Sequence, residues 1–208
     1  MQITEIITDE TLREIREHGT PEFPFEYYLD DIDEIGQGYV EWHWHNEIEW
    51  AWVESGKVIC RIGNEKIILE AGEGIFINSR VIHRFETPGG ALMPNILHAP
   101  ELLAARESAI YQKYVSPVIT YGKEYVILEK EKNSGIFLSL TVVRRKNRCI
   151  PCDYWVTAIS VVVLKYSNLI FPFTFLLYCS HFTLCYKLIV CPKTAGFMKI
   201  IRNLFSFI

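Results

Sequence analysis

Two histidines and a glutamate are spaced so that they can share one face of a β-segment. His43 and His45 lie two residues apart, and Glu49 follows four residues after the second. Alternate side chains of a strand point to the same side, so this parity places all three together. His83 is a fourth candidate, in a later segment of similar character. Imidazole and carboxylate are common ligands of divalent transition metals, so the pattern predicts a polar site within a β-fold.

The sequence around these residues has the pattern of short strands. Aromatic and β-branched residues dominate segments that end at turns containing glycine, such as Gly63-Asn64. Strands are expected at residues 23–29, 39–45, 47–54, 57–62, 66–70, 75–78, 81–87 and 91–98. Short strands at such close spacing favour an all-β sandwich or small barrel.

Short helical segments are expected on both sides of these strands. Asp9 can cap a helix that runs to His18. Pro100 can occupy the first turn of another helix that begins at Glu101. Residues 123–133 are charged and are expected to form a helix or a linker.

Other polar and aromatic residues receive structural interpretations. His18 is expected at a helix end, and His98 is expected to be structural. A solvated acidic turn without EF-hand spacing is expected at Asp30, Asp31, Asp33 and Glu34. Four tryptophans have the opposite parity to the histidines, so they are expected to pack against a second layer or, alternatively, a dimer partner. They are Trp42, Trp44, Trp50 and Trp52.

Charge and cysteine usage divide the chain near residue 140. Residues 1–140 carry 12 basic and 24 acidic residues, whereas residues 141–208 carry 9 basic residues and one acid, Asp153. Five of the six cysteines lie in this second part, and only Cys60 precedes it. A single cysteine excludes a disulfide scaffold in the first part and fits a cytoplasmic location. The charged first 17 residues predict no signal peptide.

The second part is strongly apolar, and three hypotheses for it stay open. Residues 169–186 hold no formally charged side chain and reach the length of a membrane span, behind a basic cluster at residues 144–148. The first hypothesis is that the region associates with a membrane through residues 154–191. The second is that it continues a folded domain. The third hypothesis is that a shifted reading frame or disrupted gene produced it. The loss of acids and the lack of an amphipathic period favour the third.

The spacing of the candidate site resembles the two sequence motifs of the cupin superfamily. The first motif is matched by Gly38, His43, His45, Glu49 and Gly56. In the second motif Gly72 and His83 keep their places, while Asn78, Arg80 and Thr87 replace its proline, second glycine and asparagine. The resemblance covers about residues 36–98. It implies a double-stranded β-helix, the jelly-roll barrel, in which all four metal-ligand positions hold ligand-competent residues.

Longer segments resemble the N-terminal sensing domain of AraC-type bacterial transcription regulators. They are residues 18–25, 43–49, 72–79 and 110–117, and the similarity spans about residues 10–135. It implies a barrel that binds a small effector, often a sugar or related metabolite, and that forms dimers. It also implies a separate DNA-binding domain with two helix-turn-helix units. Residues 141–208 show no such pattern, so the chain is expected to be a truncated regulator.

These observations predict four regions. Residues 1–24 form an N-terminal helix and arm, residues 25–98 the cupin barrel, residues 99–140 a helical connector, and residues 141–208 a hydrophobic tail.

The first functional hypothesis is a cytoplasmic effector-sensing domain with no catalytic residue and no resident cofactor. Its effector pocket is lined by His43, His45, Glu49 and His83. A divalent transition metal held by the same four residues is the alternative occupant. A metal-dependent cupin enzyme, an isomerase or oxygenase, is the alternative function. A purely structural role is the remaining interpretation of these side chains.

Overall fold

The computed structural model describes residues 6–35 and 38–132. The chain divides into two units, Met1–Phe137 and Leu138–Ile208, and the description below concerns the first. The membrane and reading-frame hypotheses fall on residues that lie outside this description. Among the described residues, every helix is too short or too polar to cross a bilayer.

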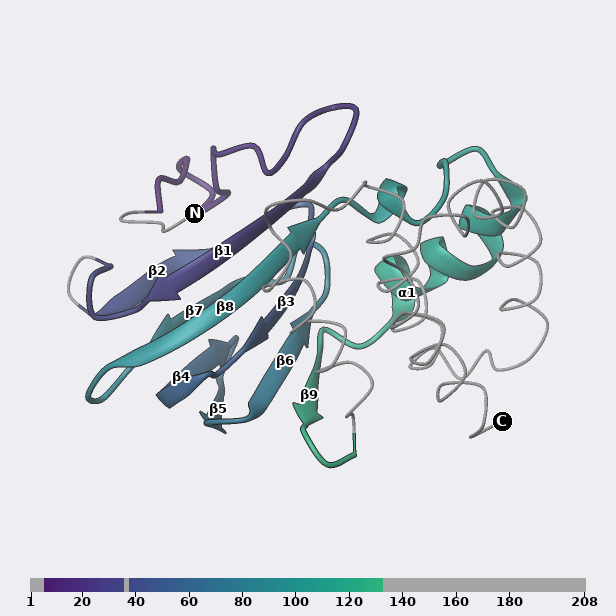
Figure 1. Ribbon diagram of the computed structural model, residues 1–208. Coiled ribbons are helices and arrows are strands. Elements are labelled where there is room, and N and C mark those ends of the chain that lie inside the picture. The colour runs from purple at the N-terminus through teal and green to yellow at the C-terminus, as the bar shows by residue number, and fades with distance from the viewer. Residues whose placement is uncertain (1–5, 36–37, 133–208) are drawn as a thin grey trace, which may run out of the picture. The chain divides into compact units, whose positions relative to one another are not determined.

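Antiparallel strands form two sheets that share one long strand (Figure 1). The strands are β1 (Phe25–Asp31), β2 (Tyr39–His43), β3 (Ile48–Trp52), β4 (Ser55–Ile62), β5 (Glu65–Glu70), β6 (Glu73–Ile77), β7 (His83–Glu86), β8 (Ala91–His98) and β9 (Tyr125–Glu129). One sheet has the order β1-β8-β3-β6-β9 and the other β2-β7-β4-β5. The start of β4 pairs with β8 and its remainder with β7, which joins the sheets. The predicted all-β jelly-roll fold is confirmed.

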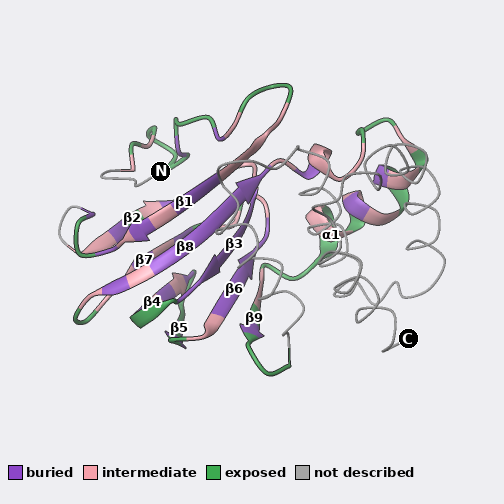
Figure 2. Cartoon of the chain, in the orientation of Figure 1, coloured by how far each residue is buried: buried purple, intermediate pink, exposed green. Residues whose placement is uncertain are grey.

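An apolar core fills the space between the two sheets. Val58, Cys60 and Ile62 alternate along β4 and are buried, as the period of two requires. They belong to one cluster with Leu69 and Phe85, whose side chains are each at most 1% exposed. Burial of each large apolar side chain contributes about 1.5–3 kcal/mol. Figure 2 shows this burial running through the central strands, while the turns stay exposed.

Two glycines in neighbouring turns provide a test of the packing at the sheet junction. Gly56 has a φ of +83°, and a Cβ there would collide with the backbone carbonyl of Gly90. Gly63 has a φ of +54°, but a Cβ there would meet nothing within 4 Å. We expect Gly63→Ala to lower the free energy of unfolding by about 1 kcal/mol and Gly56→Ala by about 3 kcal/mol or more. Urea unfolding of both variants measures the difference; equal costs would contradict the close approach.

The helix expected from Asp9 to His18 is wrong. The segment is extended and irregular, with isolated bridges between Thr8 and Glu14 and between Arg13 and Trp44. The Asp9 carboxylate accepts from the backbone N–H groups of Thr11 and Arg13, which closes a local turn instead of a helix. The backbone then pairs with Trp44, whose N–H donates to Leu12 and whose carbonyl accepts from Glu14.

The connector after β8 is helical only in part. It holds η1 (Pro100–Leu102), η2 (Tyr111–Val115) and α1 (Ser116–Tyr121), which lie beside the sheets (Figure 1). Pro100 begins η1, close to its expected place. The helix or linker expected at residues 123–133 is wrong, because Tyr125–Glu129 forms β9 and pairs with β6. Leu128 is fully buried there, so tertiary packing selects the strand.

Candidate functional site

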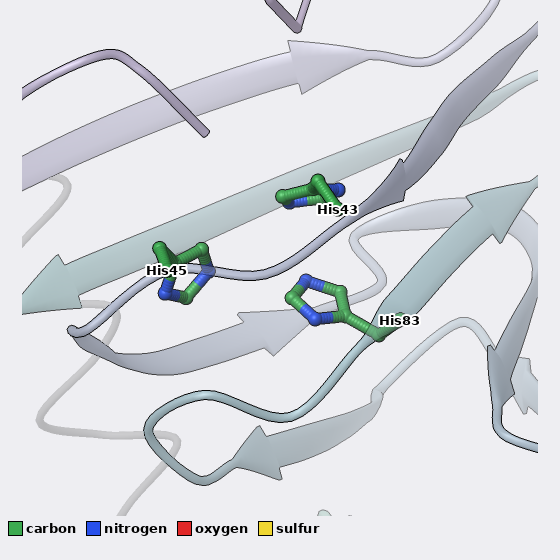
Figure 3. A group of neighbouring side chains, drawn as sticks. All are labelled: His43, His45 and His83. Carbon is green, nitrogen blue, oxygen red and sulfur yellow. The ribbon is translucent and has the colours of Figure 1, made fainter. Parts of the chain in front are cut away.

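The predicted site residues converge from three strands. His43 ends β2 and is the direct cross-strand partner of His83, the first residue of β7. His45 follows β2, and Glu49 lies on β3 after a bend. The segment therefore folds back instead of continuing as one strand, yet all four side chains are buried together. Figure 3 shows the three imidazole rings gathered around one point.

Contacts between two loops fix the position of this cluster. The N–H of Arg80 donates to the carbonyl of His45, and the Arg80 Nε donates to Asn46 Oδ1. The Ser79 hydroxyl donates to the Asn46 carbonyl. Arg80 stands where the cupin motif has glycine, and its φ is +64°, a conformation that favours glycine. These bonds hold the loop before His83 against the bend that carries His45.

Each histidine of the cluster has its Nδ1 next to a backbone carbonyl. The distances are 2.8 Å from His43 to Glu41 O, 3.1 Å from His45 to Glu47 O and 2.9 Å from His83 to Val81 O. A carbonyl only accepts, so each Nδ1 carries a proton and donates it. In the neutral rings the lone pair is then on Nε2. Metal-ligating histidines are oriented by such bonds.

The Nε2 atoms of two rings meet one carboxylate oxygen. Glu49 Oε2 lies 3.0 Å from His83 Nε2 and 3.4 Å from His45 Nε2. The His83 nitrogen is buried but is not aligned for a hydrogen bond. Lone pairs and a carboxylate repel one another at this distance, so the arrangement requires a shared positive charge, either a proton or a cation. One ligand atom from each of His43, His45 and His83 lies within 4.8 Å of the others. The residues therefore fit a transition metal in number, type and orientation.

Burial and neighbouring charges shift the pKa values of the cluster residues in different directions. Burial alone would raise the pKa of Glu49, but the neighbouring His45 and His83 outweigh it and hold that pKa below its ordinary value. Burial lowers the pKa of His43, and the neighbouring His83 and His45 lower it further. The Glu49 carboxylate overcomes the effect of burial at His83 and raises its pKa. Glu49 is thus an anion, and His43 is a neutral ring with a free Nε2.

A small cavity adjoins the cluster. Its volume is about 20 Å³, room for about one or two water-sized groups. His43 and Glu49 line it from the cluster, and Phe85 and Met93 are among its apolar lining residues. Further polar side chains line it, all of them buried: Glu14, His18, Asp30 and Asn95.

The sequence interpretation missed these further lining residues. His18 does not end a helix, because the segment that carries it is not helical. Its Nδ1 lies 2.8 Å from the Tyr28 hydroxyl, and its Nε2 lies 3.2 Å from Glu14 Oε2. Asp30 is not in a solvated turn: it lies on β1, is 3% exposed and accepts a 2.6 Å hydrogen bond from Asn95. Asp30 shares the parity of the inward-facing Tyr28, and that signal could have placed it inside.

Two tryptophans of the central segment pack within the fold. Trp50 and Trp52 are buried, with Trp50 against Phe76 at a ring separation of 4.8 Å. Trp50 also donates a hydrogen bond to His98 Nε2, while His98 Nδ1 donates to the Ala99 carbonyl. The partners of Trp50 lie on neighbouring strands of its own sheet, so these contacts do not test the expected packing against a second layer. His98 is held by hydrogen bonds within this sheet and to the residue that follows it.

His98 predicts a pH dependence of stability. Burial lowers its pKa to about 4, whereas an exposed histidine titrates near 6.5. Between these values the unfolded chain binds the proton and the folded chain does not, so stability falls as the pH falls from 6.5 towards 4. We expect His98→Gln to remove about 2 kcal/mol of the stability loss that the wild type shows between pH 7 and pH 5. Urea unfolding at both pH values checks this, and parallel pH profiles would contradict it.

Comparison with known proteins agrees with the barrel and its histidines. Residues 33–93 match the Cupin_2 family of cupin domains. This part of the chain is similar to a cupin domain. It contains the cluster residues His43, His45, Glu49 and His83, so the cupin fold and the convergent site belong to one structural unit.

One relative is a transcription regulator. The uncharacterized HTH-type transcriptional regulator YdeC of Bacillus subtilis (strain 168) is 33% identical over 115 residues, which make up 53% of this chain and 38% of YdeC. The chain thus spans well under half of that relative's length. The expected resemblance to a transcription regulator is confirmed.

Solved structures are similar to this chain at lower identity. A cupin-2 domain protein from Shewanella frigidimarina NCIMB 400 has a TM-score of 0.31 and 22% identity, over 39% of this chain and 82% of that one. Apo ToxT from Vibrio cholerae strain SCE256 has a TM-score of 0.46 and 11% identity, over 75% of this chain and 60% of that one.

Proposed function

We propose that the described residues form the effector-sensing cupin domain of an AraC-type transcription regulator. The buried polar cluster supports this proposal, because four ionisable side chains are held in a barrel beside a small cavity. Buried polar groups are costly unless they bind a partner. The regulator YdeC supplies the functional class, since the similarity to it covers 53% of this chain.

The same geometry supports a metal-centred sensing site. His43, His45, His83 and Glu49 would hold one divalent transition metal, which supplies a positive charge that attracts a donor atom of the effector. The chain's own contribution is orientation, because backbone carbonyls fix the three rings before anything binds. We therefore prefer an occupied metal site to the cofactor-free pocket expected from the sequence.

The size of the cavity limits the size of the effector that it can hold. The cavity holds about one or two water-sized groups, so a sugar-like effector would enter it with only part of its structure unless lining residues moved. The N-terminal segment supplies three of these residues, Ile6, Glu14 and His18. We propose a small effector, or one group of a larger effector, as the occupant of the cavity.

A metal-dependent cupin enzyme is the second candidate. Four protein ligands leave coordination positions open when the metal prefers five or six, and such positions can accept a substrate. The two candidates differ in the fate of the ligand, which a sensor releases unchanged and an enzyme converts.

One experiment tests metal binding and separates the candidates. The full chain is titrated with Co²⁺ and then screened for small molecules that raise its unfolding temperature. We expect about one Co²⁺ per chain, with the absorption spectrum of nitrogen and oxygen ligation. Each stabilising compound is then incubated with the metal-loaded chain and analysed by mass spectrometry. Unchanged compound supports the sensor, conversion supports the enzyme, and a chain that binds neither metal nor compound contradicts both.

The remaining parts of the regulator proposal rest on the family. A regulator of this type acts in the cytoplasm as a homodimer and binds DNA through a helix-turn-helix domain, which the described residues do not contain. The three hypotheses for residues 141–208 remain open: association with a membrane, continuation of a folded domain, or a shifted reading frame. The nucleotide sequence decides the last: a neighbouring frame after about codon 140 that encodes a helix-turn-helix domain would support a truncated regulator.

A further inference from the structure

We propose that the cavity wall formed by Glu14, Asp30 and Asn95 is a recognition subsite for an ammonium or primary-amine group. This inference rests on the proposed effector-sensing function and names the chemical class of the effector. It concerns side chains outside the cluster of His43, His45, Glu49 and His83.

Asn95, which lines the cavity, holds a buried acceptor without a partner. Its Nδ2 donates to Asp30 Oδ2 over 2.6 Å, and the reverse orientation would place an oxygen against the carboxylate. Asn95 lies opposite Tyr28 in the β1–β8 register, so Asp30 is its diagonal neighbour on the same face. The amide is thus fixed with Oδ1 buried and without a hydrogen-bond partner. An acceptor in this state calls for a ligand that donates.

Glu14 supplies a second unpartnered acceptor. His18 Nδ1 lies 2.8 Å from the Tyr28 hydroxyl, and His18 Nε2 lies 3.2 Å from Glu14 Oε2, so this carboxylate oxygen is engaged. Glu14 Oε1 remains buried without a partner, and its side chain is only 2% exposed. Both unpartnered side chains that line the cavity therefore offer acceptors.

Charge and size narrow the class of ligand. Glu14, Asp30 and Glu49 line one cavity, so the cavity favours a cationic ligand over an anionic one. A volume of about 20 Å³ admits an ammonium ion or the head of a primary amine, both comparable to water in size. A carboxylate ligand would bring a further acidic group and no donor.

The test compares cations that do and do not donate hydrogen bonds. The Co²⁺-loaded full chain is titrated at constant ionic strength with ammonium, methylammonium, tetramethylammonium or acetate, and its unfolding temperature is followed. We expect a saturable rise with ammonium and methylammonium only. Tetramethylammonium has the charge without an N–H group, so it separates hydrogen bonding from charge. A response to all salts alike, or to none, would overturn the proposal and indicate that water alone fills the cavity.

Isosteric variants test whether methylammonium binds at the cavity wall. Glu14→Gln keeps the shape of the side chain and removes its charge, and we expect the dissociation constant of methylammonium to rise about tenfold or more. Glu17→Gln makes the same change at an exposed position of the same segment and should leave it unchanged. Equal effects of the two variants would overturn the assignment. Co²⁺ binding measured on each sample separates the proposals: metal binding without an amine response contradicts only this inference, and loss of both contradicts the sensing site.

Discussion

Replacing His83 with alanine should lower the affinity of the full chain for Co²⁺ about a hundredfold or more. His83 is fully buried, its Nδ1 is held by the Val81 carbonyl, and its Nε2 lies 3.0 Å from Glu49 Oε2. Loss of groups that merely orient metal ligands costs about 10–100-fold in affinity, so loss of a direct ligand should cost at least as much. Competition with a chromophoric chelator measures the change in the dissociation constant.

The matched control is His98→Gln, which also removes a fully buried histidine. His98 Nε2 accepts from Trp50, so this ring has no nitrogen available for the cluster. We expect its Co²⁺ affinity to equal that of the wild type when both are measured below their unfolding temperatures. Similar losses in the two variants would mean that His83 acts through stability instead of ligation, and wild-type affinity in His83→Ala would remove the metal site from the proposed function.

The sequence predicted the cluster because a strand has a period of two. Every residue of β3 is buried and the pairing of β2 is irregular between Val40 and His43, so the even separations of His43, His45 and Glu49 carried this prediction, not an alternation of buried and exposed residues. His45 and Glu49 are an even number of residues apart, and their side chains still lie together although the chain bends between them. The prediction that His83 joins the cluster depended on the pairing of β2 with β7. The cupin spacing implied that pairing, whereas the local sequence pattern did not.

The other half of the cavity depends on contacts that no local pattern encodes. The segment from Asp9 to His18 has caps and apolar spacing suited to a helix, but its backbone pairs with Trp44, 30 residues away from Glu14. That tertiary pairing turns Glu14 and His18 inward. Asp30 was assigned to a turn by its acidic neighbours, although it continues the strand of Tyr28. The error at Asp30 came from the assumption that a charged residue is solvated, whereas here it lines the cavity.

The Asp30–Asn95 pair should show strong coupling in a double-mutant cycle. Asn95→Leu removes a donor from a carboxylate that is 3% exposed, and we expect it to lower the free energy of unfolding by about 2–4 kcal/mol. Replacing both partners by leucine also removes the buried charge, so the double variant should recover most of that loss. Urea unfolding of the wild type, both single variants and the double variant gives the coupling energy.

The double variant also separates folding from recognition. If the pair serves only the fold, an apolar replacement of similar size should leave every ligand response intact. If Asn95 Oδ1 and the Asp30 charge recognise an amine, the folded double variant should still bind Co²⁺ through the histidines but lose the response to methylammonium. Additive costs in the cycle would contradict the coupling. A full methylammonium response in the stable double variant would restrict any recognition to Glu14, because the buried pair would then be a feature of stability alone.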